Sequence, residues 1–188
     1  MKKRLMALLL ALSCAAGSFS AVTVADQPVT VEAATKKKAP LLKDVYSAVK
    51  KAYGDKYTPS MRLDKDNIKN RYGIPSSWYK GAIAEVPMIS TQADELVIVK
   101  AKNASAKKKI KSALLSHQKK LKEDTFQYPA NQLKLQASKV YVKGDYVCFF
   151  VLGSISNEQS QQEDESKVIA AYKTETDKAV KAIQKLYK

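Results

Sequence analysis

The sequence predicts an α+β fold in which a four-stranded antiparallel sheet is packed by amphipathic helices. Apolar residues recur at helical spacing in several segments, which predicts helices with one buried face. Two pairs of apolar runs are each joined by a short polar turn, which favours two antiparallel hairpins. The predicted order along the chain is helix, helix, hairpin, helix, hairpin, helix.

The N-terminal segment has the pattern of a secretory signal. Three basic residues at positions 2–4 precede an apolar run over 5–12, which is too short to span a bilayer. Small residues permit cleavage after Ser20, Ala25 or Ala33, and we expect the last of these. The protein is therefore predicted to be exported, either secreted or associated with the cell envelope.

The expected processing also defines the domain organisation. Removing residues 1–33 from a chain of 188 leaves 155, which is enough for one domain with a core but short for two. We expect a basic linker at 34–40 and a single α+β domain at 41–188.

Cys14 offers a different end to the signal, because a cysteine that closes an apolar run can be lipidated. A lipoprotein signal usually has leucine three residues before the cysteine and a small residue two before it. This chain has Ala11 and Leu12 at those positions. We therefore expect Cys14 to lie within a discarded signal, and the sequence predicts membrane attachment only if Cys14 is lipidated.

The charge of the chain is strongly basic. It has 33 lysines and arginines against 18 acidic residues, a net charge of +15, which becomes +14 when the signal removes three basic and two acidic residues. After the signal only Arg62 and Arg71 are arginines, and lysine lacks the planar fork that binds phosphates bidentately. The composition favours diffuse attraction to anionic cell-wall polymers, although lysines that merely solvate the surface are the simpler interpretation.

Two helices are predicted before the first hairpin. The first begins at Pro40, since proline suits the first helical position, and runs to Tyr53, with Gly54 as its cap. A second, shorter helix begins after Asp64 and stops at Gly73.

The first hairpin is predicted from strands at 82–90 and 95–102, joined by the polar residues 91–94. Pro87 cannot donate to a ladder, so its strand should be an edge strand or carry a bulge there. Glu85 interrupts the same apolar run. We interpret it as an edge-strand charge that discourages sheet-to-sheet association, with a buried acid as the alternative.

The second half of the chain repeats the order helix and hairpin. A lysine-rich helix is predicted at 104–122, with His117 as a boundary residue on its apolar face. Strands at 138–142 and 145–152 form the second hairpin, and a final helix follows the acidic residues at 158–166.

Five short segments carry a resemblance to a known family. They read AYG at 52–54, YGI at 72–74, AEVPMIS at 84–90, QYP at 127–129 and GDYV at 144–147. Over residues 41–152 the chain resembles a family of small exported or lipoprotein-type proteins of Gram-positive bacteria, catalogued as a domain of unknown function. The resemblance implies export and one domain, but no activity or site residues. The chain departs from the family in its poor lipidation site and its high lysine content.

The sequence offers little for catalysis, and we expect no catalytic residue. His117 and Cys148 are the only histidine and the only cysteine after the signal, and they lie on different predicted elements. Cys148 lies in a continuous apolar run, which predicts a buried structural thiol. A hydrolase using carboxylates such as Glu85 and Asp145 remains an alternative, and it requires a concave site where two acids converge.

We expect neither a metal nor a cofactor. The residues at 64–67 suggest calcium, but they lack the third acidic position and the glycine of a calcium loop, so helix capping is the better interpretation. The chain also lacks a glycine-rich phosphate loop.

The leading hypothesis is thus an exported, non-enzymatic domain that binds an envelope component, either an anionic wall polymer or a protein. Nucleic acid is not an expected partner, because the protein is exported. The second alternative, besides the hydrolase, is an inhibitor or accessory module that docks on a secreted or membrane protein. Its candidate surface is the sheet edge with Glu85 and Pro87, or an exposed patch around Trp78 and Tyr79.

Overall fold

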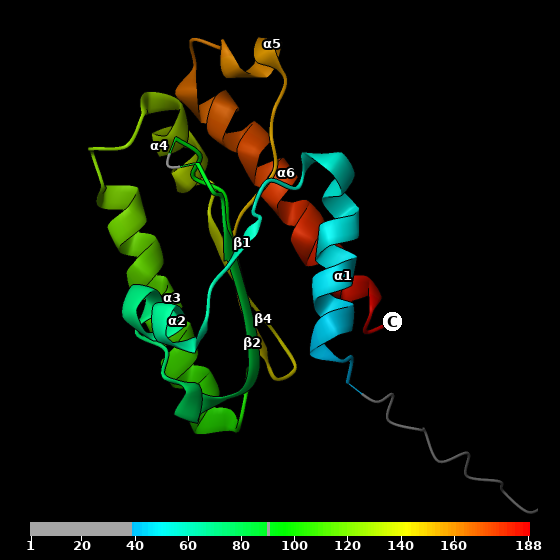
Figure 1. Cartoon of the computed structure of the whole chain (residues 1–188). Helices are drawn as coiled ribbons and strands as arrows, with labels where there is room; N and C mark the ends of the chain where they lie inside the picture. Colours follow the sequence, from blue (N-terminus) through cyan, green and yellow to red (C-terminus); the bar gives the residue numbers. More distant parts are fainter. Residues whose placement is uncertain (1–38, 90) are drawn as a thin grey trace, which may run out of the picture. The chain divides into compact units, whose positions relative to one another are not determined.

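A computed structural model describes residues 39–89 and 91–188. The predicted signal, its cleavage points and Cys14 lie outside the described residues. The fold is α+β, as the sequence predicts, and helices cover both faces of one antiparallel sheet (Figure 1).

The sheet has five strands rather than the four predicted, in the order β1-β2-β3-β5-β4. Every neighbouring pair is antiparallel. The additional strand, β1, has only two residues, which is too short to show a period of two in the sequence. The strands are β1 (Met61–Arg62), β2 (Tyr79–Val86), β3 (Glu95–Ala101), β4 (Lys139–Lys143) and β5 (Tyr146–Val151).

The helices form a layer on each face of the sheet. On one face α1 and α6 pack together, and on the other lie α2 and α3 (Figure 1). The helices are α1 (Leu42–Tyr53), α2 (Lys65–Tyr72), α3 (Ala104–Glu123), α4 (Pro129–Gln136), α5 (Asn157–Ser160) and α6 (Glu165–Lys185), with short 3₁₀ turns η1 (Gly54–Lys56) and η2 (Ser76–Trp78). None of the helices in the described ranges is long and apolar enough to cross a membrane.

The two central strands, β3 and β5, supply both halves of the core. Alternate residues of a strand point to opposite faces, so Leu96 and Ile98 pack under α1 and α6, while Val97 and Val99 pack under α2 and α3. Burial on both faces explains why these strands read as continuous apolar runs. Cys148 lies in the middle of β5 and is fully buried, which confirms the predicted structural thiol.

The helix ends follow local chemistry that the sequence predicts. Gly54 and Gly73 cap the C-termini of α1 and α2 with positive φ angles of 55° and 69°. The Asp64 side chain accepts hydrogen bonds from the backbone N–H groups of Asp66 and Asn67 at the start of α2. Helix capping is thus confirmed for this segment.

The prediction of an edge strand or a bulge at Pro87 is wrong. The strand β2 ends at Val86, one residue before the proline, so no ladder hydrogen bond is lost there. This strand is paired on both sides, with β1 and β3, and its register shift lies at its other end, between Tyr79 and Gly81.

The helix α4 and the short helix α5 are absent from the predicted order. Pro129 occupies the first turn of α4, and Leu135 reaches the core beneath α3. The Asn131 side chain donates a hydrogen bond of 2.9 Å to the Thr91 carbonyl. This contact attaches α4 to the connection between β2 and β3, at one end of the sheet.

Candidate functional site

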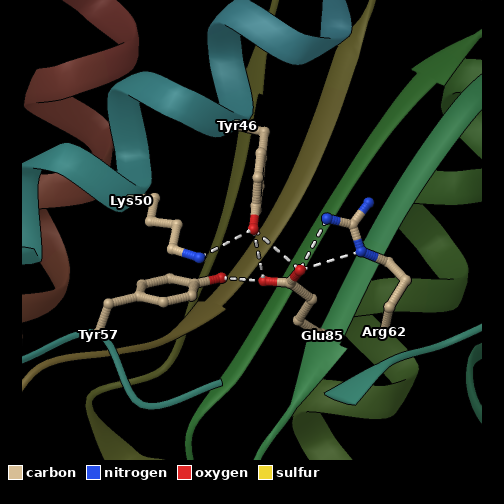
Figure 2. Close-up of polar contacts among 5 residues, drawn as sticks. All are labelled: Tyr46, Lys50, Tyr57, Arg62 and Glu85. Atoms are coloured by element: carbon tan, nitrogen blue, oxygen red, sulfur yellow. Dashed lines mark hydrogen bonds and ion pairs between the residues drawn. The ribbon is translucent and has the colours of Figure 1, made fainter. Parts of the chain in front are cut away.

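Glu85 lies at the centre of a hydrogen-bond network on the sheet face covered by α1 (Figure 2). Its side chain is buried, with the residue only 5% exposed. The Arg62 guanidinium donates to Oε1 through Nε at 2.9 Å and Nη2 at 2.7 Å. The Tyr57 hydroxyl donates to Oε2 at 2.6 Å, and the Tyr46 hydroxyl lies 3.0 and 3.2 Å from the two oxygens.

Each partner is positioned by a different element. Arg62 stands directly opposite Glu85 in the β1–β2 register, Tyr46 lies on α1, and Tyr57 follows η1. Lys50, one turn after Tyr46 on α1, donates a weak hydrogen bond of 3.5 Å to the Tyr46 hydroxyl. Figure 2 shows the side chains of Tyr46, Tyr57 and Arg62 converging on the carboxylate, with Lys50 at the Tyr46 hydroxyl.

The Glu85 network connects elements of the fold and does not face a ligand pocket. Both carboxylate oxygens of Glu85 accept hydrogen bonds, and Glu85 lines neither of the two pockets described below. Burial, followed by the hydrogen bond to Glu85, raises the pKa of the Tyr57 hydroxyl far above its ordinary value. The Tyr57 hydroxyl therefore stays protonated and donates its hydrogen bond to Glu85.

Glu85 is therefore a buried acid, and the interpretation as an edge-strand charge is wrong because β2 is paired on both sides. The structure does not bring it near Asp145. Glu85 pairs with Leu96 on β3, whereas the Asp145 carbonyl accepts from the Ala101 N–H at the other end of that strand. Five residues at ~3.3 Å each separate the two levels by about 17 Å.

A second buried glutamate, Glu95, has a similar network on the opposite face. Glu95 is 2% exposed and begins β3. Its Oε1 accepts from Arg71 Nε at 2.9 Å and from the Tyr72 hydroxyl, and its Oε2 lies 3.2 Å from His117 Nε2. The His117 ring also packs edge-on against Tyr72 and Phe149.

The electrostatics of Glu95 favour its charged form. Burial alone would raise the pKa of its carboxyl, but the hydrogen bond and charge of His117 and the charge of Arg71 hold that pKa below the ordinary value. This network was not predicted from the sequence, in which Glu95 reads as a strand residue and His117 as a boundary residue of a helix. A charged residue at the start of an apolar strand was the available signal.

Pro87 lines a pocket at the end of the sheet where Glu85 and Glu95 lie. This Pro87 pocket has a volume of about 380 Å³ and apolar walls that include Val86, Met88 and Ile89. Met88 is 78% exposed, and Ile89 is also exposed. Of the polar residues that line it, Arg71 and Glu95 are already paired with each other, and Asp94 borders it as well.

Trp78 and Tyr79 do not form an exposed patch. Both side chains are half-buried and pack against the core under α2 and α3. The Lys109 ammonium lies 5.5 Å above the Trp78 ring and covers it further. The sequence alone could not show that these two aromatics pack under α2 and α3.

The most concentrated charge in the described part of the chain lies on α3. This helix carries seven lysines and one acidic residue, Glu123. Five of the lysines are exposed. Lys109 lies over the Trp78 ring, and the other four make up what we call the α3 lysine face: Lys108, Lys111, Lys119 and Lys120. Within the described residues, no group of three or more His, Cys, Asp or Glu side chains is placed to hold a metal ion.

The molecule is thus an α+β protein with two buried glutamate networks and a basic outer helix. The chain belongs to the family described as a domain of unknown function, DUF4358, whose model matches residues 52–152. The match includes all five strands, both glutamates and all their hydrogen-bond partners except Tyr46. No curated protein and no solved structure shows a significant match.

Proposed function

We propose that this protein is an exported, non-catalytic binding module that is held at the cell envelope by anionic wall polymers. The observation that carries the proposal is the α3 lysine face, where four exposed ammonium groups project from one helix. The N-terminal signal pattern and the net charge of +15 support it.

The chemistry of the face suits a repeating polyanion. Lysine ammonium groups are hydrated point charges on flexible stems, so they attract negative charge without imposing a fixed geometry. Such an attraction is weakened by salt, because the Debye length falls to ~3 Å at 1 M. Lys119 makes only an exposed pair with Glu123, at 3.7 Å, so its charge remains available to a ligand.

The non-catalytic part of the proposal rests on the carboxylates. Glu85 and Asp145 lie at opposite ends of the sheet, and each buried glutamate already accepts hydrogen bonds at both oxygens. A carboxylate pair for hydrolysis requires two acids that face one substrate. Neither glutamate network has this arrangement.

Export and retention at the envelope are tested first, by fractionating the producing cells and measuring the intact mass of the mature protein. We expect a chain that begins at Ala34 and is released from the wall fraction by salt. A diacylated mass that begins at Cys14 would replace retention by charge with a lipid anchor.

The lysine face is tested by sedimentation of the protein with Gram-positive cell walls, before and after extraction of their anionic polymers. Replacing the four lysines of the α3 lysine face with glutamine should lower the salt concentration that releases the protein. The matched control replaces four exposed lysines of α6, namely Lys167, Lys173, Lys181 and Lys185. Equal loss in both variants would assign retention to net charge alone, and binding to extracted walls would contradict the polymer as ligand.

The exposed apolar residues at the Pro87 pocket favour a second candidate function, docking on a secreted or membrane protein. Met88 and Ile89 project beside an apolar pocket, and exposed apolar groups of this kind often mark protein contacts. Crosslinking from position 88 in producing cells would test it. A specific partner lost in an Ile89→Asp variant supports docking, and crosslinks that the variant leaves unchanged contradict it.

A further inference from the structure

Asp94 has a buried carboxylate oxygen without a protein partner. The residue is 5% exposed, and its Oδ2 lies 2.5 Å from the Lys134 ammonium on α4. Its Oδ1 is buried and has no hydrogen-bond partner within residues 39–89 and 91–188. Because leaving a buried acceptor unpaired is unfavourable, this oxygen calls for a donor from outside the protein.

A second unpartnered atom belongs to a residue that lines the same pocket as Asp94. The Thr58 hydroxyl oxygen is buried and also lacks a hydrogen-bond partner among the described residues. Thr58 and Asp94 both line a pocket of about 310 Å³ between α4, α6 and the segment after β5, which we call the Asp94 pocket. Two residues that line one pocket thus each carry an orphaned polar atom, which favours a polar ligand there.

The charge of the Asp94 pocket favours a neutral ligand. The Lys134 ammonium already balances the Asp94 carboxylate, and Lys56 lines the pocket too. A cation would be repelled by the two lysines, and an anion would be repelled by the Asp94 carboxylate. A neutral group that donates a hydrogen bond meets neither penalty.

The other residues that line the Asp94 pocket indicate which class of neutral ligand fits it. Thr58 and Ser154 supply hydroxyls, which both donate and accept. The Asn131 amide nitrogen is engaged with the Thr91 carbonyl, which leaves its oxygen as an acceptor, and the Tyr172 ring adds an apolar wall. A sugar ring combines hydroxyls that donate and accept with apolar C–H faces.

We propose that the Asp94 pocket binds a neutral saccharide unit, one hydroxyl of which donates to Asp94 Oδ1 while another pairs with the Thr58 hydroxyl. The volume lies at the lower end of the ~300–1,000 Å³ of small-molecule sites, which suits a single short ligand. None of the residues of the α3 lysine face lines this pocket, so the inference does not depend on the proposed retention by charge.

The experiment is an NMR titration of the exported protein with N-acetylglucosamine and its β-1,4-linked tetramer. It is performed in about 0.5 M sodium chloride, where the Debye length is only a few ångströms and attraction through the lysine face is screened. Methylammonium chloride and sodium phosphate serve as the cationic and anionic probes. We expect saturable shifts with a saccharide at the amides of Thr58, Asp94 and Asn131, and none with the two charged probes.

Two variants localise the binding. Thr58→Val removes one orphaned hydroxyl at nearly constant shape, and Asp94→Asn replaces the acceptor pair with an amide. Each should weaken saccharide binding about tenfold, the loss expected for one buried hydrogen bond. The matched control is Thr174→Val on the exposed side of α6, where the hydroxyl only bonds the Ala170 carbonyl, and its affinity should not change.

The possible results separate clearly. If Asp94→Asn fails to fold because Lys134 loses its partner, Thr58→Val alone decides the question. Saccharide binding that Thr58→Val leaves unchanged overturns the proposal. So does saturable binding of methylammonium or phosphate at these amides, or no shift with any probe, which would assign the two orphaned atoms to water.

Discussion

Arg62 and Glu85 face each other across the β1–β2 ladder and form an ion pair of 2.7 Å between Nη2 and Oε1. On the opposite face of the sheet, Arg71 and Glu95 form an equivalent pair of 2.9 Å. In both pairs the glutamate is buried in the sheet, whereas about half of the arginine side chain is exposed.

Both glutamates attach the N-terminal half of the domain to the sheet. The partners of Glu85 come from α1, the loop after η1 and β1, and two of the partners of Glu95 come from the end of α2. Since each carboxylate collects several donors from segments that are distant in the sequence, the networks help to hold these segments in register with β2 and β3. We therefore assign them a structural role, distinct from the Asp94 pocket.

Replacing Glu85 with glutamine should destabilise the fold without unfolding it. The amide keeps one acceptor oxygen but puts an NH₂ group against the donors Tyr46, Tyr57 and Arg62. We expect a loss of about 2 kcal/mol in the free energy of unfolding, measured by urea denaturation.

The control for this substitution is Glu123→Gln, which removes a carboxylate from an exposed pair with Lys119. Its effect should stay within about 0.5 kcal/mol. Equal stability of both variants would show that the Glu85 network contributes little to folding, and its buried geometry would then need a functional explanation instead.

Cys148 should be unreactive in the folded protein. Its thiol is fully buried in β5, and burial raises the pKa of the thiol well above its ordinary value, so almost no thiolate forms at neutral pH. An aromatic disulfide reagent should label one thiol in urea and none in native buffer. Rapid native labelling of the signal-free protein would mean that β5 opens often, and a Cys148→Ala variant would confirm the labelled site.

The order of the main elements could be predicted from the sequence because long helices leave periodic apolar patterns and strands buried on both faces leave continuous apolar runs. The helices α3 and α6 show the first pattern, and β3 and β5 show the second. The strand β1 could not be found, since two exposed residues carry no period. Pro87 misled the analysis because the rule about proline applies within a strand, and β2 ends one residue earlier.

The polar sites were harder to predict than the fold. Glu85 attracted attention because it interrupts an apolar run, but its partners lie 23 to 39 residues away, at distances that no local pattern encodes. The Asp94 pocket was missed altogether, because Asp94 reads as a turn residue and its proximity to Lys134 depends on how α4 docks. Both the Glu85 network and the Asp94 pocket are formed by residues that are distant in the sequence and meet only in the folded protein.

Gly153 should tolerate alanine poorly, because two obstacles coincide there. Its φ is +95°, and an added Cβ would lie 2.6 Å from Glu175 Cβ on α6. We expect a loss of about 3 kcal/mol in urea denaturation, from backbone strain and overpacking together. Gly73→Ala is the control: its φ is +69° but nothing lies within 4 Å, so strain alone should cost about 1 kcal/mol. Equal losses would mean that α6 moves away from Gly153 freely.

Glu95 should make the fold sensitive to acid. Its pKa is held below the ordinary value of 4.5 by His117 and Arg71, despite burial, so the folded state binds its proton less readily than the unfolded state. The resulting stability is fully present above pH 4.5 and is lost as the pH falls through the lower, folded-state pKa. Urea midpoints measured from pH 6 downwards should therefore decline once the pH falls below 4.5. In Glu95→Gln, which cannot titrate, the protein should be less stable at pH 6 but its decline should be shallower; an identical slope in both proteins would place the acid sensitivity in other carboxylates.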